Sequence, residues 1–341
     1  MAEQASLIHC DVDLDAPGKQ TGFLRLPHSV HRSAYGWIPI PIVTIANDDG
    51  PTVLLVAGNH GDEYEGQIAL MDLARMVAPD DLAGRLIILP AINFPAVMAS
   101  ARVSPIDGGN LNREFPGNAL GTPTQMIAHF VSSVLAPRVD HCLDVHSGGT
   151  SLAYDAVLLS GPPPVDLEAR NRQRAYIEAI GLPSTLVFRG GGVTGGRNLG
   201  AVIRAAGGTS FAAEIGGGAH VTPASVATAK AMLRRYLTAT GVWRGAPASE
   251  PPAATRFLAN GPEDYLYAME AGLFEPLAGI GDEVDAGQPA ALIHFPDTPW
   301  RAPVELAFPR SGIVVCVRPL AQCVRGDCLF QTGAPWPDAF A

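Results

Sequence analysis

Short apolar runs along this chain alternate with stretches that have helical spacing. The apolar runs predict strands at residues 6–14, 36–45, 53–57, 85–89, 141–145, 185–188 and 210–215. Helices are predicted from Asp62 or Glu63 up to Pro79 and at residues 124–136, 166–180 and 224–239, with a glycine-rich loop at 190–196. This alternation predicts an α/β fold with a mixed, largely parallel central sheet and flanking helices.

The pattern changes after residue 244, where the predicted α/β domain of residues 1–244 ends. Residues 245–254 are rich in Pro and Ala and predict a linker. Beyond it, short strands and glycine turns predict a smaller all-β domain at residues 255–341. Its turn GDEVDAGQP, at 281–289, resembles that of biotinyl/lipoyl-like sandwiches. A carrier domain needs an attachment lysine, and none follows Lys230, so we interpret this domain as a lid or an oligomer contact.

Composition limits the classes of partner. The 341 residues carry a net charge of −10, whereas nucleic-acid binding needs clustered Lys and Arg. No apolar run approaches the roughly 20 residues of a membrane span, and the N-terminus lacks the features of a signal peptide. The five scattered cysteines fit reduced thiols better than a disulfide framework. We therefore expect a cytoplasmic protein with no nucleic-acid or membrane partner.

The segment around His60 and Glu63 is the first candidate for chemistry. The two residues lie across a predicted strand-to-helix turn, where a spacing of three directs both side chains the same way. An imidazole nitrogen and a carboxylate oxygen could then meet one metal ion, and Gly58 and Gly61 let the backbone bend tightly. The alternative is an ordinary helix N-terminus, in which Glu63 complements the helix dipole and His60 is incidental.

His146 is the candidate third ligand. It follows the predicted strand at 141–145 and precedes Ser147 and two glycines, at the end of a strand where α/β sheets place their ligands. The alternative is a core or loop histidine. Two histidines and one carboxylate form the ligand set of a hydrolytic zinc site, in which zinc lowers the pKa of water to about 7. One zinc ion per chain is predicted, although such ligands also accept cobalt or manganese.

Glu214 is the candidate general base. It closes the predicted apolar strand at 210–215 and precedes a run of three glycines. A carboxylate is costly to bury at such a position without a purpose. Close to a metal, it could take a proton from water and pass it to the leaving nitrogen. The alternative is a glutamate at a strand end that is turned toward solvent.

The loop at residues 104–117 supplies candidates for substrate binding. Asn112 and Arg113 offer an amide and a guanidinium fork that suit a substrate carboxylate. Arg102, just upstream, could reach the scissile carbonyl and stabilise its developing negative charge. The alternative is that these arginines are solvated loop cations.

Four short motifs in this order resemble the succinylglutamate desuccinylase and aspartoacylase family, which belongs with the zinc carboxypeptidase-like hydrolases. They are HGDE at 60–63, NLNREFPG at 110–117, DVHSGG at 144–149 and EIGGG at 214–218. The longer strings RSAYGWIPIPI at 32–42, GNHGDEYEG at 58–66 and SPIDGGNLNREFPG at 104–117 are similar to one branch of that family, the N-alpha-acetyl-L-2,4-diaminobutyrate deacetylases of ectoine breakdown. The resemblance covers most of residues 25–335.

The resemblance implies a role for each of these candidate residues. It implies zinc on His60, Glu63 and His146, with Glu214 as general base and acid. It also implies a substrate carboxylate on Asn112 and Arg113, and Arg102 at the carbonyl. One departure is Asn110, where many related enzymes have an acidic residue that orients a ligand histidine; Asp144 is a candidate replacement, because it shares a strand face with His146.

The predicted function is zinc-dependent hydrolysis of the amide bond in an N-acylated small amino acid. The favoured reaction is the deacetylation of N-alpha-acetyl-L-2,4-diaminobutyrate. One alternative is succinylglutamate desuccinylase or aspartoacylase activity, which needs basic groups for a second carboxylate; Arg189, Arg197 and Arg204 are candidates. Further alternatives are a carboxypeptidase and, from another class, a non-catalytic metal-binding protein. The chain is also a candidate homo-oligomer.

Overall fold

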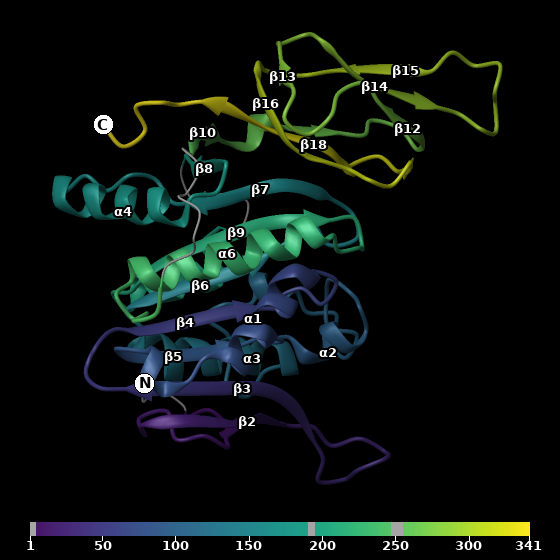
Figure 1. Ribbon diagram of the computed structural model, residues 1–341. Coiled ribbons are helices and arrows are strands. Elements are labelled where there is room, and N and C mark those ends of the chain that lie inside the picture. The colour runs from purple at the N-terminus through teal and green to yellow at the C-terminus, as the bar shows by residue number, and fades with distance from the viewer. Residues whose placement is uncertain (1–4, 190–194, 247–254) are drawn as a thin grey trace.

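The computed structural model describes residues 5–189, 195–246 and 255–341. Most of the predicted glycine-rich loop at 190–196 and of the predicted linker at 245–254 therefore lies outside the described residues. Figure 1 shows the elements stacked along one long sheet, with the C-terminal strands at one end and β2 at the other.

The main sheet contains the strands of the predicted α/β domain in a mixed arrangement. Their spatial order is β1 (His9–Cys10), β2 (Gly18–Pro27), β3 (Trp37–Asn47), β5 (Gly84–Leu89), β4 (Thr52–Ala57), β6 (His141–His146), β9 (Thr209–Gly217), β7 (Ala153–Ser160) and β8 (Ser184–Phe188). The central strands β5, β4, β6 and β9 are parallel to one another. Strand β3 pairs in antiparallel fashion with β5 and with β2, and β7 pairs in the same way with β9. The prediction of a mixed sheet with flanking helices is confirmed.

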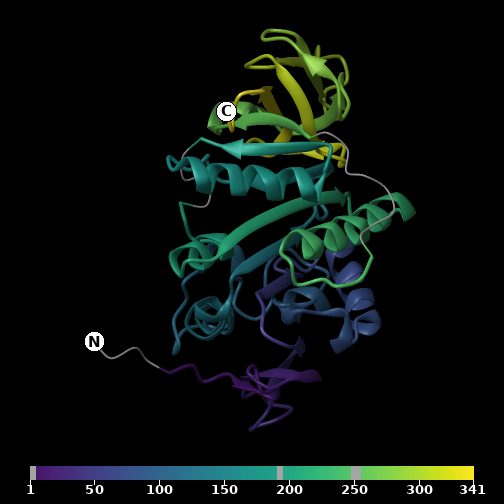
Figure 2. The ribbon, with the colours of Figure 1, turned by 60° about the vertical axis from the view of Figure 1, so that its left-hand side comes forward.

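Helices cover both faces of this sheet, which is why its central strands are continuous apolar runs. On β4, the side chains of Val53, Leu55 and Ala57 pack with α1 (Tyr64–Met76), α4 (Leu167–Ile180) and α6 (Pro223–Ala239). Those of Leu54 and Val56 belong to a second core with α3 (Pro123–Phe130) and α5 (Leu199–Ala205). Figures 1 and 2 show α1 and α6 on the same side of the sheet.

Shorter helical segments complete the connections. They are η1 (Pro79–Asp81), α2 (Phe94–Met98), η2 (Leu111–Arg113), η3 (Val131–Leu135), η4 (Ala136–Arg138) and η5 (Pro262–Asp264). Together α3, η3 and η4 occupy most of the helix predicted at 124–136. Among the described helices, none is both long and apolar enough to cross a membrane.

The described residues from 255 onward form strands and the single short helix η5. Hydrogen bonding of the main sheet continues into them through β10 (Arg256–Asn260), β18 (Cys328–Pro335), β16 (Gly312–Val317), β13 (Glu283–Val284) and β11 (Tyr265–Tyr267). A second sheet consists of β15 (Val304–Ala307), β14 (Pro289–His294), β12 (Gly272–Pro276) and β17 (Gln322–Cys323). Strand β10 is parallel to β8, so the two predicted domains share one sheet. The predicted division between them stays a prediction.

The N-terminal strand prediction at residues 6–14 is wrong in its extent, because only His9 and Cys10 pair with β2. Asp13 accepts a hydrogen bond from the backbone of Asp15 at 2.9 Å, and this local contact turns the chain out of the sheet. The apolar residues of the segment still contribute to the core, with Val12 and Leu14 buried. Strands β2 and β7 and helices α2 and α5 were not predicted.

Candidate active site

A tight turn between β4 and α1 presents His60 and Glu63. Gly58 has a φ of +70°, which favours glycine. A Cβ atom on Gly61 would lie 2.0 Å from the carbonyl carbon of Ala96, so only glycine fits against α2. Glu63 precedes the first residue of α1 with extended backbone angles. The predicted helix start is thus confirmed to within one or two residues, and the turn directs both side chains to the same place.

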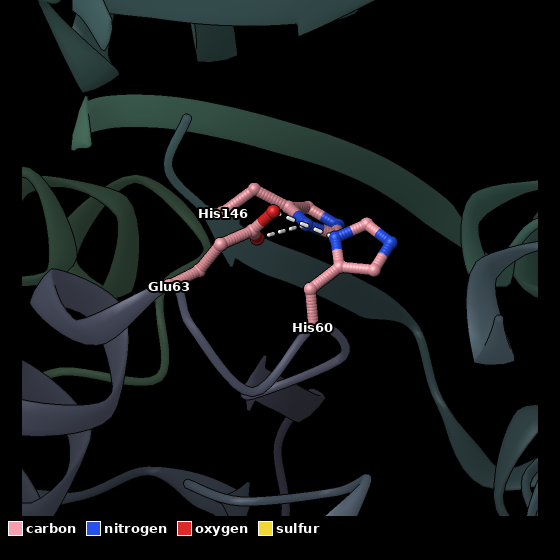
Figure 3. Close-up of side chains that lie close together, drawn as sticks. All are labelled: His60, Glu63 and His146. Carbon is pink, nitrogen blue, oxygen red and sulfur yellow. Dashed lines mark hydrogen bonds and ion pairs between the residues drawn. The ribbon is translucent and has the colours of Figure 1, made fainter. Parts of the chain in front are cut away.

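His60, Glu63 and His146 lie together as predicted, and all three are buried (Figure 3). His60 Nδ1 is 2.7 Å from Glu63 Oε1, and His146 Nδ1 is 2.7 Å from Glu63 Oε2. One ligand atom from each residue falls within 4.8 Å of the others. His146 reaches this position because β6 is the parallel neighbour of β4, so that both strands end at the same edge of the sheet. The three residues form a possible metal site.

The second ring nitrogen of each histidine also has a polar neighbour. Asp144 Oδ2 lies 2.8 Å from His146 Nε2, and Asn110 Oδ1 lies 3.2 Å from His60 Nε2. An oxygen at this position accepts the Nε2 proton, which leaves Nδ1 free for a metal. The amide of Asn110 is therefore placed to orient His60, and Asp144 orients the other histidine.

Charges within this cluster shift the pKa values of its members. Burial by itself would raise the pKa of Glu63, but His60 and His146 outweigh it and hold that pKa well below its usual range. Burial would likewise lower the pKa of His146, whereas the carboxylates of Asp144 and Glu63 raise it well above its usual value. Without a metal, Glu63 is thus an anion and His146 favours its protonated form, so a divalent cation that binds these residues must displace the proton of the imidazole.

Glu214 lies within β9, directly beside His146, its partner in the parallel β6–β9 register. Its Oε2 atom is buried and has no hydrogen-bond partner among the described residues. Burial, with the negative charge of Glu63 added to it, raises the pKa of Glu214 to about 8. The carboxyl group is therefore close to the cluster without belonging to it, and it is able to exchange a proton near neutral pH.

The predicted substrate-binding residues line the same site. Arg102 Nη1 is 3.4 Å from Glu63 Oε1 and 3.5 Å from His60 Nδ1. Asn112 Nδ2 is 3.5 Å from His146 Nε2, and its Oδ1 atom accepts a hydrogen bond from the backbone of Leu199 at 3.3 Å. Arg113 donates to the carbonyl oxygen of Asn112 at 2.8 Å. Arg102 and the amide of Asn112 thus reach the three-residue cluster, and Arg113 lies beside Asn112.

Of the three further arginines suggested by the sequence, Arg197 is the one that acts on Arg113. Burial lowers the pKa of Arg113, and the charges of Arg102 and Arg197 lower it further. The guanidinium of Arg189 instead lies over the ring of Trp336, 5.3 Å from its centre. Arg204 extends along α5 toward Gly200. Arg102 and Arg197 are therefore close enough to Arg113 for their charges to lower its pKa.

Two buried polar residues near the cluster were not among the sequence-based candidates. Gln67 donates to the carbonyl oxygens of Gly61 and Glu63, at 3.2 and 2.7 Å, and so holds the turn in shape. Asn59 donates to Asp144 Oδ2 at 3.1 Å. The sequence offers one signal for both, since Asn59 lies within the string GNHGDEYEG at 58–66 and Gln67 directly follows it.

The fold and the residues at the strand ends are those of a known class of proteins. The family model of the succinylglutamate desuccinylase/aspartoacylase catalytic domain matches residues 49–240, which is more than half of the chain. The chain therefore belongs to this family, as its motifs indicated.

Individual relatives resemble nearly the whole chain. The N-alpha-acetyl-L-2,4-diaminobutyric acid deacetylase of Halomonas elongata is 35% identical over 332 residues, which cover 96% of this chain and 95% of the relative. A product-bound structure of the ectoine utilization protein EutE (DoeB) from Ruegeria pomeroyi has a TM-score of 0.91 at 34% identity, with 97% of this chain and 100% of that chain covered. The succinylglutamate desuccinylase/aspartoacylase of Rhodobacter sphaeroides has a TM-score of 0.90 at 38% identity, with 97% and 99% covered.

Proposed function

We propose that this protein is a zinc-dependent amidohydrolase that removes the acetyl group from N-alpha-acetyl-L-2,4-diaminobutyrate. The observation that carries the proposal is the position of Glu214 beside the cluster of His60, Glu63 and His146, with a buried Oε2 atom that has no hydrogen-bond partner among the described residues. A metal site that only stores or senses an ion has no need of such a group. The likeness to a deacetylase of this substrate over 96% of the chain supports the choice of substrate.

The donor set fits zinc. His60 and His146 offer their Nδ1 atoms and Glu63 its carboxylate, and this combination of two histidines and one carboxylate leaves a position open for substrate or water. When bound, zinc supplies Lewis-acid polarisation of the amide carbonyl and favours the deprotonated form of water. The same ligand set supports the zinc carboxypeptidase-like assignment of the fold, which we include in the proposal.

The residues of the chain then divide the reaction among them. Glu214 accepts a proton from the attacking water and delivers it to the leaving α-nitrogen, so that acetate and the free amino acid are released. Arg102, next to Glu63, is placed to donate hydrogen bonds to the carbonyl oxygen as negative charge develops there. Arg113 and Asn112 hold the α-carboxylate of the substrate, because a guanidinium fork binds a carboxylate with two parallel hydrogen bonds.

A second candidate function is the hydrolysis of a substrate with two carboxylates, such as N-acetylaspartate or N-succinylglutamate. The observation that favours it is that the charge of Arg197, in addition to that of Arg102, lowers the pKa of Arg113. One carboxylate leaves part of this positive charge uncompensated, whereas a second carboxylate neutralises it. On this hypothesis Arg197 binds the additional carboxylate.

The C-terminal strands fit a structural role in this function. Strand β16 pairs with β7, and Tyr154 Oη donates to Gln331 Oε1 at 2.9 Å across the same contact. Strand β7 in turn pairs with β9, which carries Glu214. We propose that residues 255–341 are a separate domain that supports this side of the site. The cytoplasmic location and a homo-oligomeric state stay predictions.

The experiment that tests the proposal is hydrolysis of a small panel by the zinc-loaded protein. The panel contains N-alpha-acetyl-diaminobutyrate, N-acetylaspartate, N-succinylglutamate and a dipeptide, and each is repeated with Glu214→Gln and Arg197→Ala. We expect a preference for the first substrate and a fall of about 10²- to 10⁴-fold in kcat for Glu214→Gln, with zinc still bound. A preference for a dicarboxylate that Arg197→Ala abolishes would establish the second candidate instead. Tight zinc binding without any turnover would support a non-catalytic metal-binding protein.

A further inference from the structure

A buried amide lies behind the metal cluster and has no role in the proposed mechanism. Asn59 follows β4 and directly precedes His60, and its side chain is 1% exposed. Its Nδ2 atom donates a hydrogen bond to Asp144 Oδ2 at 3.1 Å. The same oxygen lies 2.8 Å from His146 Nε2. Asn59 and His146 therefore share one carboxylate oxygen.

We propose that Asn59 is a positioning residue that sets the orientation of His146 through Asp144; the proposal rests on the metal site of the proposed function. Asp144 Oδ2 accepts the Nε2 proton of His146, which keeps Nδ1 bare and directed at the metal position. The amide of Asn59 fixes where that oxygen lies. The turn after β4 thus supplies one ligand, His60, and through Asn59 it also orients a second ligand, His146 on β6.

The backbone around Asn59 is itself held in place. Asn93 Nδ2 donates to the carbonyl oxygen of Asn59 at 3.3 Å, and the backbone N–H of Asn93 donates to the carbonyl oxygen of Gly58 at 3.0 Å. Asn93 is fully buried in front of α2. Asp144 is equally fixed, because Val56 of β4 is its direct partner in the β4–β6 register. Asn59 therefore links the ends of β4 and β6, two strands that the sheet holds at a fixed distance.

The stability of the fold does not account for this arrangement. Asn59 Oδ1 and Asp144 Oδ1 are buried, and neither has a hydrogen-bond partner among the described residues. A buried polar atom without a partner costs free energy, and an apolar side chain of similar volume avoids that cost. Asn59 places such an atom in the interior, and it also contacts Asp144, the carboxylate that orients the candidate ligand His146. Positioning therefore explains Asn59 better than packing does.

The test is zinc affinity, measured by chelator competition on the full-length protein with Asn59→Leu. We expect a loss of about 10- to 100-fold, together with an altered visible spectrum of the cobalt-loaded protein, because His146 is no longer aligned. Urea unfolding of the metal-free form should show unchanged or higher stability. The matched control is Thr44→Val on β3, which removes another fully buried polar group, a hydroxyl without a hydrogen-bond partner among the described residues, and should leave zinc affinity unchanged.

A double-mutant cycle with Asp144→Asn tests the route of the effect. If Asn59 acts through Asp144, the double variant should bind zinc no more weakly than Asp144→Asn alone. Zinc affinity within about twofold of the unchanged protein in Asn59→Leu, or fully additive losses in the cycle, would overturn the proposal. Should Asn59→Leu fail to fold, Asn59→Ser serves the same comparison with a smaller side chain.

These outcomes are separate from those of the proposed function. Zinc affinity is measured without substrate, so the role of Asn59 stands even when no acyl amino acid is hydrolysed. If the unchanged protein does not bind zinc, the metal site and the role of Asn59 both fall.

Discussion

The two walls of the site are built in different ways. The ligand wall, formed by His60, Glu63 and His146, is buried, and its four ring nitrogens all have polar neighbours. The arginine wall consists of Arg102 and Arg197, which lie in loops, and Arg113, the last residue of the short helix η2. The side chain of Arg102 is 46% exposed, and Arg197 is also exposed.

This difference separates two kinds of specificity. The ligand wall lies where water is excluded, so its charges interact strongly and its geometry tolerates little change. In the arginine wall, Arg102 and Arg197 are open to solvent, where charges are screened and side chains can move, whereas Arg113 is half-buried. Metal binding should therefore be hard to alter without loss of function, whereas substrate preference should be easy to change.

The largest effect should come from Glu63→Gln in the ligand wall. Glu63 is the only carboxylate that faces both Nδ1 atoms within the described cluster, and the amide removes its charge. We expect zinc affinity to fall by more than about 100-fold, which exceeds the loss expected when a residue that only orients a ligand is replaced. Metal content after dialysis and chelator competition measure it.

The matched control is Glu65→Gln, two residues further along the same helix start. Glu65 is also buried, but both of its carboxylate oxygens lack a hydrogen-bond partner among the described residues. This variant should keep zinc affinity. Equal losses in Glu63→Gln and Glu65→Gln would mean that the helix start is merely disturbed, and would contradict the role of Glu63.

A smaller effect should come from Arg113→Lys in the arginine wall. Lysine keeps the charge but lacks the planar fork, so the α-carboxylate loses one of two parallel hydrogen bonds. We expect KM for the acyl amino acid to rise about tenfold, with little change in kcat or in zinc affinity. Added salt should raise KM of the unchanged protein in the same direction.

Steady-state kinetics measure this prediction, and Arg174→Lys is its control. Arg174 is an exposed arginine on α4 that pairs with Glu178. Its replacement should leave KM unchanged. A fall in kcat without a rise in KM would place Arg113 at the reacting carbonyl rather than at the carboxylate.

A third effect, on the fold rather than on binding, concerns the pH dependence of stability in the metal-free protein. The folded state raises the pKa of Glu214 from 4.5 to about 8, so the folded chain binds a proton here that the unfolded chain releases. This contribution to the free energy of unfolding is present at low pH and is lost as the pH rises from 4.5 to about 8. Glu214→Gln has no such proton to lose.

Urea unfolding across this pH range measures the difference. Glu214→Gln should gain in stability relative to the unchanged metal-free protein as the pH rises, and added zinc should reduce the gap because a cation favours the carboxylate. A difference that is constant with pH would show that the pKa of Glu214 is not raised.

Much of the site could be predicted because its residues belong to local patterns. The spacing of His60 and Glu63 across a strand-to-helix turn is a local property, and the structure confirms that their side chains meet. His146 and Glu214 were placed by a single rule, that parallel strands bring their carboxyl ends to one edge. Their roles in catalysis stay predictions.

The errors occurred where packing overrides local preference. The segment at 6–14 has the apolar residues of a strand, but only His9 and Cys10 pair, since its buried side chains fill a core that β2 already borders. Strand β7 has only partly buried residues in its first half and gave no clear apolar run. Its place in the sheet is set by its neighbours on both sides, β9 and β8.

The sequence by itself determined the family, the order of the central strands and helices along the chain, and the residue types of the possible metal site. Only the tertiary structure decided which of Arg189, Arg197 and Arg204 contacts the site, and that Asn59 shares a carboxylate oxygen with His146. The physical reason is distance along the chain. Motif residues are fixed by the backbone conformation of a few neighbours, whereas these contacts join segments that only the sheet register and the packing of helices bring together.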